Sequence, residues 1–368
     1  MIAKRKTNIE LLRIFSMILI ILHHYVAHGG LVDIDIISGN KFIGKFLYIG
    51  GKLGVVIFIL IIGYFMVDSK FKIRKLIKIY LEVLFYSVGI YLILLFCNKI
   101  EFSLTKFIKS ILPISYGQYW FVTGYIGLYI FSPFINKLIK NLDKSQYITL
   151  ILIGTIVLVV IPTLTPKGKG IYSDILYFIY LYVLSGYLKK YKIKFIDSKK
   201  KCILLIITML IFIMTVSIVS TFMAQYVKIF DKLIKYFDKS NSVPILILAL
   251  SIFELFRTVE IRENKAIYMF ARTSFAVYLI HDNVNFKKIL WNDIFKTNEF
   301  FYANSVKLLI HIIVTLAVIY IGCTMIELIR EKLFRRIIYN IKINKIETIL
   351  DKIDERMNMV VDNENIDC

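Results

Sequence analysis

Apolar runs of about 20 residues recur along the whole chain and are separated by shorter polar segments. A helix of about 20 apolar residues matches the thickness of a bilayer core, so each run predicts a membrane span. We therefore predict an all-α fold, a polytopic transmembrane helical bundle of about ten spans. The predicted spans are 9–27, 47–67, 76–97, 118–138, 147–165, 171–188, 202–223, 243–257, 266–283 and 305–328.

The segments that join these runs are short, so we expect no separate soluble domain. We predict one transmembrane domain over residues 1–328 and a C-terminal tail over 329–368, which is basic at first and acidic from Asp351. Glycines at the start of the second run let another helix or a ligand approach its backbone closely. They are Gly50, Gly51 and Gly54.

The chain carries a net charge of +21, which in other proteins can indicate a nucleic-acid partner. Here the charges follow the predicted topology. With the N-terminus in the cytosol, the inner connections hold 20 Lys or Arg in 48 residues and the outer connections 14 in 83. This positive-inside bias predicts a multi-pass plasma-membrane protein with both termini cytoplasmic and no nucleic-acid partner. The basic inner connections would also attract a polyanionic ligand such as a phosphate-bearing coenzyme.

Two further features narrow the class of protein. The run 9–27 contains ionisable residues and is not followed by a small-residue cleavage site, so we expect it to be retained rather than removed as a signal peptide. The cysteines lack a paired or metal-like spacing, so we predict neither a disulfide framework nor a metal site. They are Cys97, Cys202, Cys323 and Cys368.

The first run carries Glu10, Arg13, His23 and His24 within an otherwise apolar helix. Ionisable groups in hydrocarbon are costly and usually mark a ligand path or a reaction site. His24 is eleven positions after Arg13. At about 100° per residue, eleven steps turn the helix by three full turns plus about 20°. Both side chains therefore project from one face, about 16 Å apart along the helix axis at 1.5 Å per residue. This spacing suits a molecule that lies along the helix.

Each of these residues can have either a functional role or a purely structural one. A neutral His24 imidazole can act as a general base or as a nucleophile that briefly holds an acyl group, or it can simply reach the headgroups at the membrane surface. Arg13 presents a fork of donors that suits phosphate or carboxylate, or it can pair internally with Glu10 one turn earlier. His23 points about 100° away from His24 and is expected to be structural, and His28 follows in the outer connection.

A second polar cluster ends the ninth run. It contains Arg272, Tyr278, His281, Asp282 and Asn283. In the predicted topology His281 and Asp282 reach the outer surface at the level of His24, while Arg272 lies toward the inner half at the level of Arg13. We therefore expect two histidines and a carboxylate to converge from the first and ninth spans. The alternative is a polar pair that merely ends a helix.

Aromatic residues begin the fourth run at its outer end, where Tyr119 and Trp120 precede Phe121. An aromatic belt at the membrane interface explains them fully. Rings of this kind can also stack on a sugar, so both readings stay open.

Together these residues resemble the acyltransferase 3 family of integral-membrane acyltransferases. The most specific part is an acidic residue and an arginine followed, after ten intervening residues, by a histidine. Four other segments along the chain are similar to the family pattern. They are the glycine-opened second run from Gly54 to Tyr64, the basic segment 72–75, Tyr119 to Phe134, and Ser274 to His281.

The resemblance implies transfer of an acyl group, usually acetyl, from cytosolic acyl-CoA to a hydroxyl of an envelope glycan or lipid-linked saccharide. It implies acetyl-CoA as donor and no metal. We expect Glu10, Arg13, His24 and His281 to be catalytic, with the CoA phosphates bound by basic residues and the acceptor by residues near the outer end. The expected CoA-binding residues are Arg13, Arg74 and Arg272, and the expected acceptor-binding residues are Tyr119, Trp120, Tyr278 and Asp282.

Two other classes of protein would also place charges within spans. A transporter or flippase of a lipid-linked sugar would do so without acyl chemistry, but we find no inverted repeat of the kind many transporters show. A glycan polymerase normally has a large outer loop, and the chain shows none. The alignment of Arg13 with His24 favours the acyltransferase.

Overall fold

In the computed structural model, all regular secondary structure among the described residues is helical. The described residues are 6–31, 36–165, 173–228, 230, 233, 237, 239–338 and 344–362. The α-helices are α1 (Thr7–Gly29), α2 (Gly39–Met66), α3 (Ile73–Phe96), α4 (Leu104–Ile111), α5 (Trp120–Asn141), α6 (Lys144–Thr155), α7 (Ile161–Leu164), α8 (Asp174–Lys190), α9 (Lys199–Met223), α10 (Val243–Thr258), α11 (Lys265–His281), α12 (Thr297–Phe300), α13 (Ser305–Ile338) and α14 (Asn344–Asp362). Ile156–Val160 and Ile289–Ile294 are π-helical, and Lys194–Ile196 is a 3-10 helix.

A helix overlaps each of the ten predicted runs, but the predicted count of about ten spans is not confirmed. Among the described residues, six helical segments are long and apolar enough to cross a membrane: Thr7–Gly29, Gly39–Met66, Ile73–Phe96, Lys144–Leu164, Lys199–Met223 and Ser305–Phe334. Helices α8, α10 and α11 have 17, 16 and 17 residues, fewer than the about 20 that a bilayer core requires. On length and composition the chain is a membrane protein.

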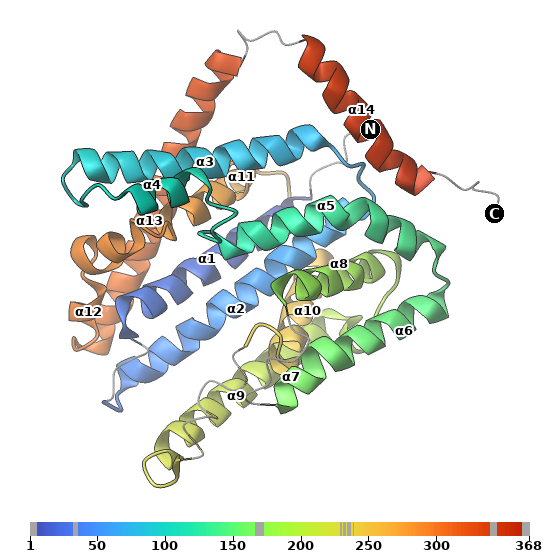
Figure 1. Cartoon of the computed structure of the whole chain (residues 1–368). Helices are drawn as coiled ribbons and strands as arrows, with labels where there is room; N and C mark the ends of the chain where they lie inside the picture. The colour runs from blue at the N-terminus through green and yellow to red at the C-terminus, as the bar shows by residue number, and fades with distance from the viewer. Residues whose placement is uncertain are drawn as a thin grey trace.

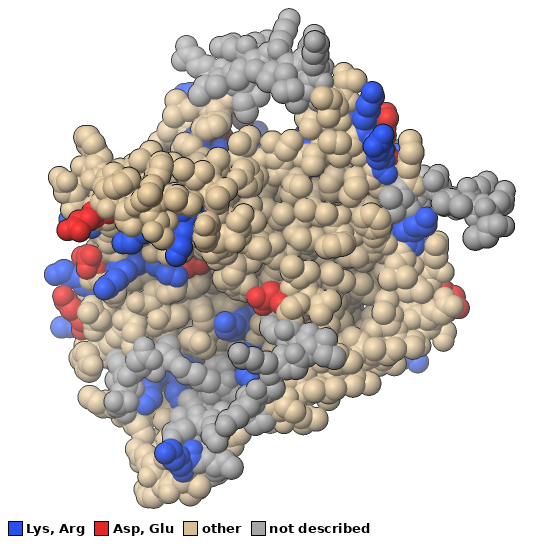
Figure 2. Space-filling view, viewed as in Figure 1, with Lys and Arg blue, Asp and Glu red and all other residues tan. Residues whose placement is uncertain are grey.

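Helices α1 and α2 run side by side through the middle of the bundle (Figure 1), and α1 also packs against α10, α11 and α13. On the face shown in Figure 2, charged side chains gather along the left side and at the upper right, a few lie near the centre, and most of the remaining described surface is uncharged.

Local sequence explains where these helices begin and end. Ser38 starts α2 and Ser198 starts α9, and each side chain accepts a hydrogen bond from a backbone N–H in the first turn. Such caps satisfy donors that have no partner within the helix. Helix α1 ends at Gly29 and is capped by Gly30, whose φ of +86° is left-handed and favours glycine.

The predicted close approach at the glycines of α2 is present. A Cβ atom on Gly54 would lie 2.6 Å from the carbonyl oxygen of Ser16, and one on Gly50 would lie 2.9 Å from that of Leu19. Both obstacles are backbone atoms of α1, which cannot swing aside as a side chain can. These glycines therefore set the distance between the two central helices.

We expect Gly54→Val to lower the free energy of unfolding by about 1–3 kcal/mol or more, the usual cost of overpacking. The loss should appear as a lower midpoint of thermal unfolding in detergent. Gly89→Val is the matched control, because a Cβ on Gly89 in α3 would meet nothing within 4 Å. Equal midpoints for the two variants would contradict this account.

The tail helix α14 packs against α5 and α3. Asn358 accepts a hydrogen bond from the backbone N–H of Phe71 at 2.8 Å and donates one to its carbonyl at 3.1 Å, while Asp354 accepts one from Ile73 N–H at 2.6 Å. One turn earlier, Asp351 pairs with Arg74 at 3.0 Å. Helix α13 is continuous across the predicted domain boundary at 328/329 and ends at Ile338.

Candidate active site

The ends of α1 and α11 bring two histidines together. Nδ1 of His24 lies 2.9 Å from Nε2 of His281, although 257 residues separate them in the chain. His281 is fully buried, and the side chain of His24 is 13% exposed. The convergence expected from the first and ninth predicted spans therefore exists in the structure.

The hydrogen-bond network assigns the proton positions on these rings. Nδ1 of His281 lies 2.5 Å from the backbone carbonyl of Val277, which can only accept, so this nitrogen carries the proton. In a neutral His281 ring, Nε2 is then an acceptor, and Nδ1 of His24 donates to it. This leaves Nε2 of His24 unprotonated, with its lone pair available to take a proton.

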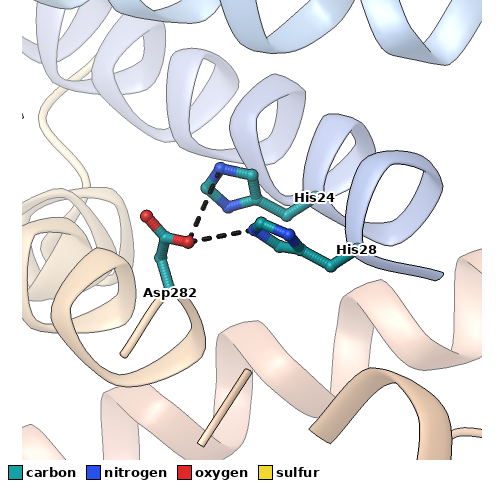
Figure 3. Close-up of side chains that lie close together, drawn as sticks. All are labelled: His24, His28 and Asp282. Atoms are coloured by element: carbon teal, nitrogen blue, oxygen red, sulfur yellow. Dashed lines mark hydrogen bonds and ion pairs between the residues drawn. The ribbon is translucent and has the colours of Figure 1, made fainter. Parts of the chain in front are cut away.

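Asp282, at the end of α11, faces His24 and His28 of α1 (Figure 3). Its Oδ1 accepts a hydrogen bond from Nε2 of His28 at 3.0 Å and lies 4.0 Å from Nε2 of His24. Lys287 approaches the same oxygen at 3.6 Å. A carboxylate at this distance stabilises the imidazolium that forms when His24 takes a proton.

His28 takes part because α1 extends two residues beyond the predicted run, to Gly29. Its side chain therefore lies one helical turn after His24 on the same face rather than in a connection. The ligand atoms of His24, His28 and Asp282 all lie within 4.8 Å of one another, which is close enough to hold a metal ion.

A cavity of about 100 Å³ opens beside His24. Among its walls are Lys52 of α2, Trp120 of α5 and Tyr278 of α11. The Tyr278 hydroxyl is buried and has no hydrogen-bond partner among the described residues. The cavity thus offers a lone-pair nitrogen, a cation, a free hydroxyl and an aromatic ring.

A second cavity, of about 280 Å³, lies toward the other end of α1. Its walls include Arg13, Lys75 and Arg272. Arg13 pairs with Glu10 at 2.5 Å and Arg272 with Glu331 at 2.9 Å, while the Lys75 ammonium lies 4.9 Å from the centre of the Tyr129 ring. Three cations therefore line this cavity, and two of them already have a carboxylate partner, so an anionic ligand would have to share their donors.

Three aromatic side chains line both cavities: Phe58, Phe121 and Phe275. Each cavity also contains one end of the Arg13–His24 pair. The two cavities therefore follow each other along one face of α1, and the three aromatic side chains lie between them.

Five of the ten expected site residues line neither cavity: Glu10, Arg74, Tyr119, His281 and Asp282. The Tyr119 hydroxyl donates to the carbonyl of Leu279 at 3.1 Å and accepts from Asn283 at 2.8 Å, so it ties the start of α5 to the end of α11. Arg74 is paired with Asp351, and its neighbour Lys75 lines the basic cavity instead. Asp282 reaches the site through His24 and His28 rather than as a wall of the cavity.

Sequence reasoning missed Lys52 and Lys75. Lys52 did carry a signal, because it is the sole charged residue between Lys45 and Asp68. Lys75 lies in a basic segment in which all neighbours look alike, so its inward direction required the structure. His23 was expected to be structural. Its Nδ1 lies 2.6 Å from the backbone carbonyl oxygen of Tyr48, and its side chain also lines the cavity beside His24.

The fold and the site define a class of protein: a helical membrane protein with a basic cavity at one end of α1 and a histidine–aspartate cluster between α1 and α11 at the other. Residues 6–326 match the model of the acyltransferase 3 family, described as an acyltransferase domain. The chain therefore belongs to this family and is a membrane acyltransferase. No curated protein and no solved structure matches it significantly.

Proposed function

We propose that the protein moves an acyl group, in the first instance acetyl, from cytosolic acyl-CoA to a hydroxyl of an envelope polysaccharide or lipid-linked sugar. The observation that carries the proposal is the pair of cavities along α1, one basic at Arg13 and one beside the lone pair of His24. In this proposal the Arg13 end faces the cytosol, in agreement with the bias of Lys and Arg toward the inner connections.

The basic cavity suits the phosphates of CoA, and the proposal requires the three shared aromatic side chains to part so that the uncharged pantetheine arm can pass between the cavities. An arm that follows the face of α1 for about 16 Å from Arg13 carries its thioester to His24. The acceptor hydroxyl enters the second cavity from the opposite end of the bundle. Holding both substrates in one geometry supplies much of the rate enhancement.

In the reaction, Nε2 of His24 takes the proton from the acceptor hydroxyl as its oxygen attacks the thioester carbonyl. The carbon–sulfur bond breaks and its electron pair leaves on the CoA thiolate. His24 then returns the proton to the thiolate, so that an ester and free CoA result. Asp282 stabilises the imidazolium between the two proton transfers, and His281 keeps the ring in the required tautomer.

Release of CoA by the purified protein tests this function. The protein in lipid nanodiscs is given acetyl-CoA and envelope glycan extracted from a strain that lacks the gene. We expect thiol release that depends on the glycan, together with new ester-linked acetyl signals in the NMR spectrum of the glycan. A transporter or flippase would release no CoA, and that result would overturn the proposal.

A further inference from the structure

Lys52 lines the cavity beside His24 and has no role in the proposed reaction. It lies well within α2, in an apolar stretch where Lys45 and Asp68 are the nearest charged residues along the chain. Its side chain is half-buried and forms part of the wall of the cavity beside His24. Lys52 lies at the level of His23 and His24, near the outer end of the predicted spans, and an ionisable group in such an apolar stretch is a candidate for function.

Other charged groups on these helices have partners. Arg13 is paired with Glu10, Arg272 with Glu331, and Arg330 with Glu327. Earlier on α2, the ammonium of Lys45 hydrogen-bonds to Thr221. Within the described part of the chain, by contrast, Lys52 forms no hydrogen bond and no ion pair.

The groups around Lys52 do not supply the missing charge. The cavity walls contain His23 and His24 but no carboxylate. The nearest acidic group of the site, Asp282, already accepts from His28 at 3.0 Å and faces Lys287 at 3.6 Å. The cavity walls therefore leave Lys52 available to an anion that enters the cavity.

Two other groups in this cavity, the Tyr278 hydroxyl and the Trp120 ring, also suit a sugar ligand. The buried hydroxyl of Tyr278 has no hydrogen-bond partner among the described residues, and a buried unpaired hydroxyl is unfavourable. The Trp120 ring offers a surface on which a sugar ring can stack. A sugar with an acidic substituent would satisfy the ammonium, the hydroxyl and the ring together.

We infer that the substrate carries a carboxylate or phosphate close to the hydroxyl that is acylated, and that Lys52 binds it. This inference rests on the proposed function. Because Lys52 and His24 line one small cavity, the anion and the hydroxyl belong to the same sugar or to adjoining units. The same chemistry could be supplied by a dicarboxylic acyl group, such as succinyl, on the donor.

Matched substrates test the inference. Initial rates are measured in nanodiscs with acetyl-CoA and either methyl glucoside or methyl glucuronoside, which differ by one carboxylate, and with succinyl-CoA and methyl glucoside. We expect kcat/KM to be at least tenfold higher for the glucuronoside than for the glucoside. A preference shown only by succinyl-CoA would place the anion on the donor and overturn the acceptor assignment.

Three variants separate charge from structure. Lys52→Met should raise KM for the glucuronoside at least tenfold and leave the glucoside within about twofold, while Lys52→Arg should restore most of the preference. Lys45→Met is the control, because Lys45 lies on the same helix but outside the cavity. Equal loss for both acceptors in Lys52→Met would mean a merely structural role and would contradict the inference.

A measurement of sugar binding in the absence of acyl-CoA tests the role of Lys52 independently of the proposed acyl transfer. Quenching of tryptophan fluorescence is suited to this because Trp120 lines the cavity. We expect the glucuronoside to bind at least tenfold more tightly than the glucoside, and Lys52→Met to abolish the difference. Selective binding without CoA release would refute the acyl transfer alone, and acyl transfer without selectivity would refute the role of Lys52 alone.

Discussion

His24→Ala is expected to lower kcat for acyl transfer by a factor of about 10²–10⁴, the usual contribution of a general base. The loss follows from the hydrogen-bond network, in which His281 accepts from Nδ1 of His24 and leaves Nε2 free to take the hydroxyl proton. KM for acetyl-CoA should change little, because in the proposed function the coenzyme phosphates bind at the other end of α1. The measurement is CoA release under saturating donor.

His311→Ala is the matched control for His24→Ala. His311 is also a histidine within a span, but its Nδ1 contacts the Tyr25 hydroxyl at 2.8 Å and it lies outside the cavity beside His24. We expect that variant to lose thermal stability while kcat stays within a few-fold of the wild type. If His24→Ala retained more than a tenth of the wild-type kcat in a folded, inserted protein, His24 would not be the base.

The positions of the helices could be predicted from the sequence because apolar length is a strong signal. Each predicted run is overlapped by a helix, and the spacing of Arg13 and His24 correctly placed both on the face of α1 that the two cavities follow. The number of spans could not be predicted in the same way. Helices such as α10 are apolar but too short on their own, and their burial against α9 and α2 depends on tertiary packing.

The finer arrangement of the site depends on directions that composition does not reveal. Arg74 and Lys75 are adjacent, yet about 100° separates their side chains on a helix, so one meets the tail helix and the other lines the cavity. Tyr119 looked like an interface aromatic, but its hydroxyl is bonded inside the bundle. Contacts between segments far apart in the chain decide such cases.

The second large effect is expected from Arg13. Arg13→Met should raise KM for acetyl-CoA by about 10–100-fold, because a hydrogen bond to a charged group contributes about 1.5–3 kcal/mol and 1.4 kcal/mol corresponds to a factor of ten. Since the variant leaves the buried Glu10 without its partner, the double variant Glu10→Gln/Arg13→Met is measured beside it. The double variant should show the same rise in KM with less loss of stability.

Acetyl-pantetheine identifies the cause of the Arg13 effect, because it carries the same thioester without the phosphates of CoA. We expect its KM to be high in the wild type and nearly unchanged in Arg13→Met. Arg257→Met is the control, since Arg257 also pairs with a glutamate three residues earlier, at 2.8 Å, but lies away from the basic cavity. If Arg13→Met raised KM equally for both donors, Arg13 would shape the cavity without binding phosphate, and the coenzyme would have to lie elsewhere.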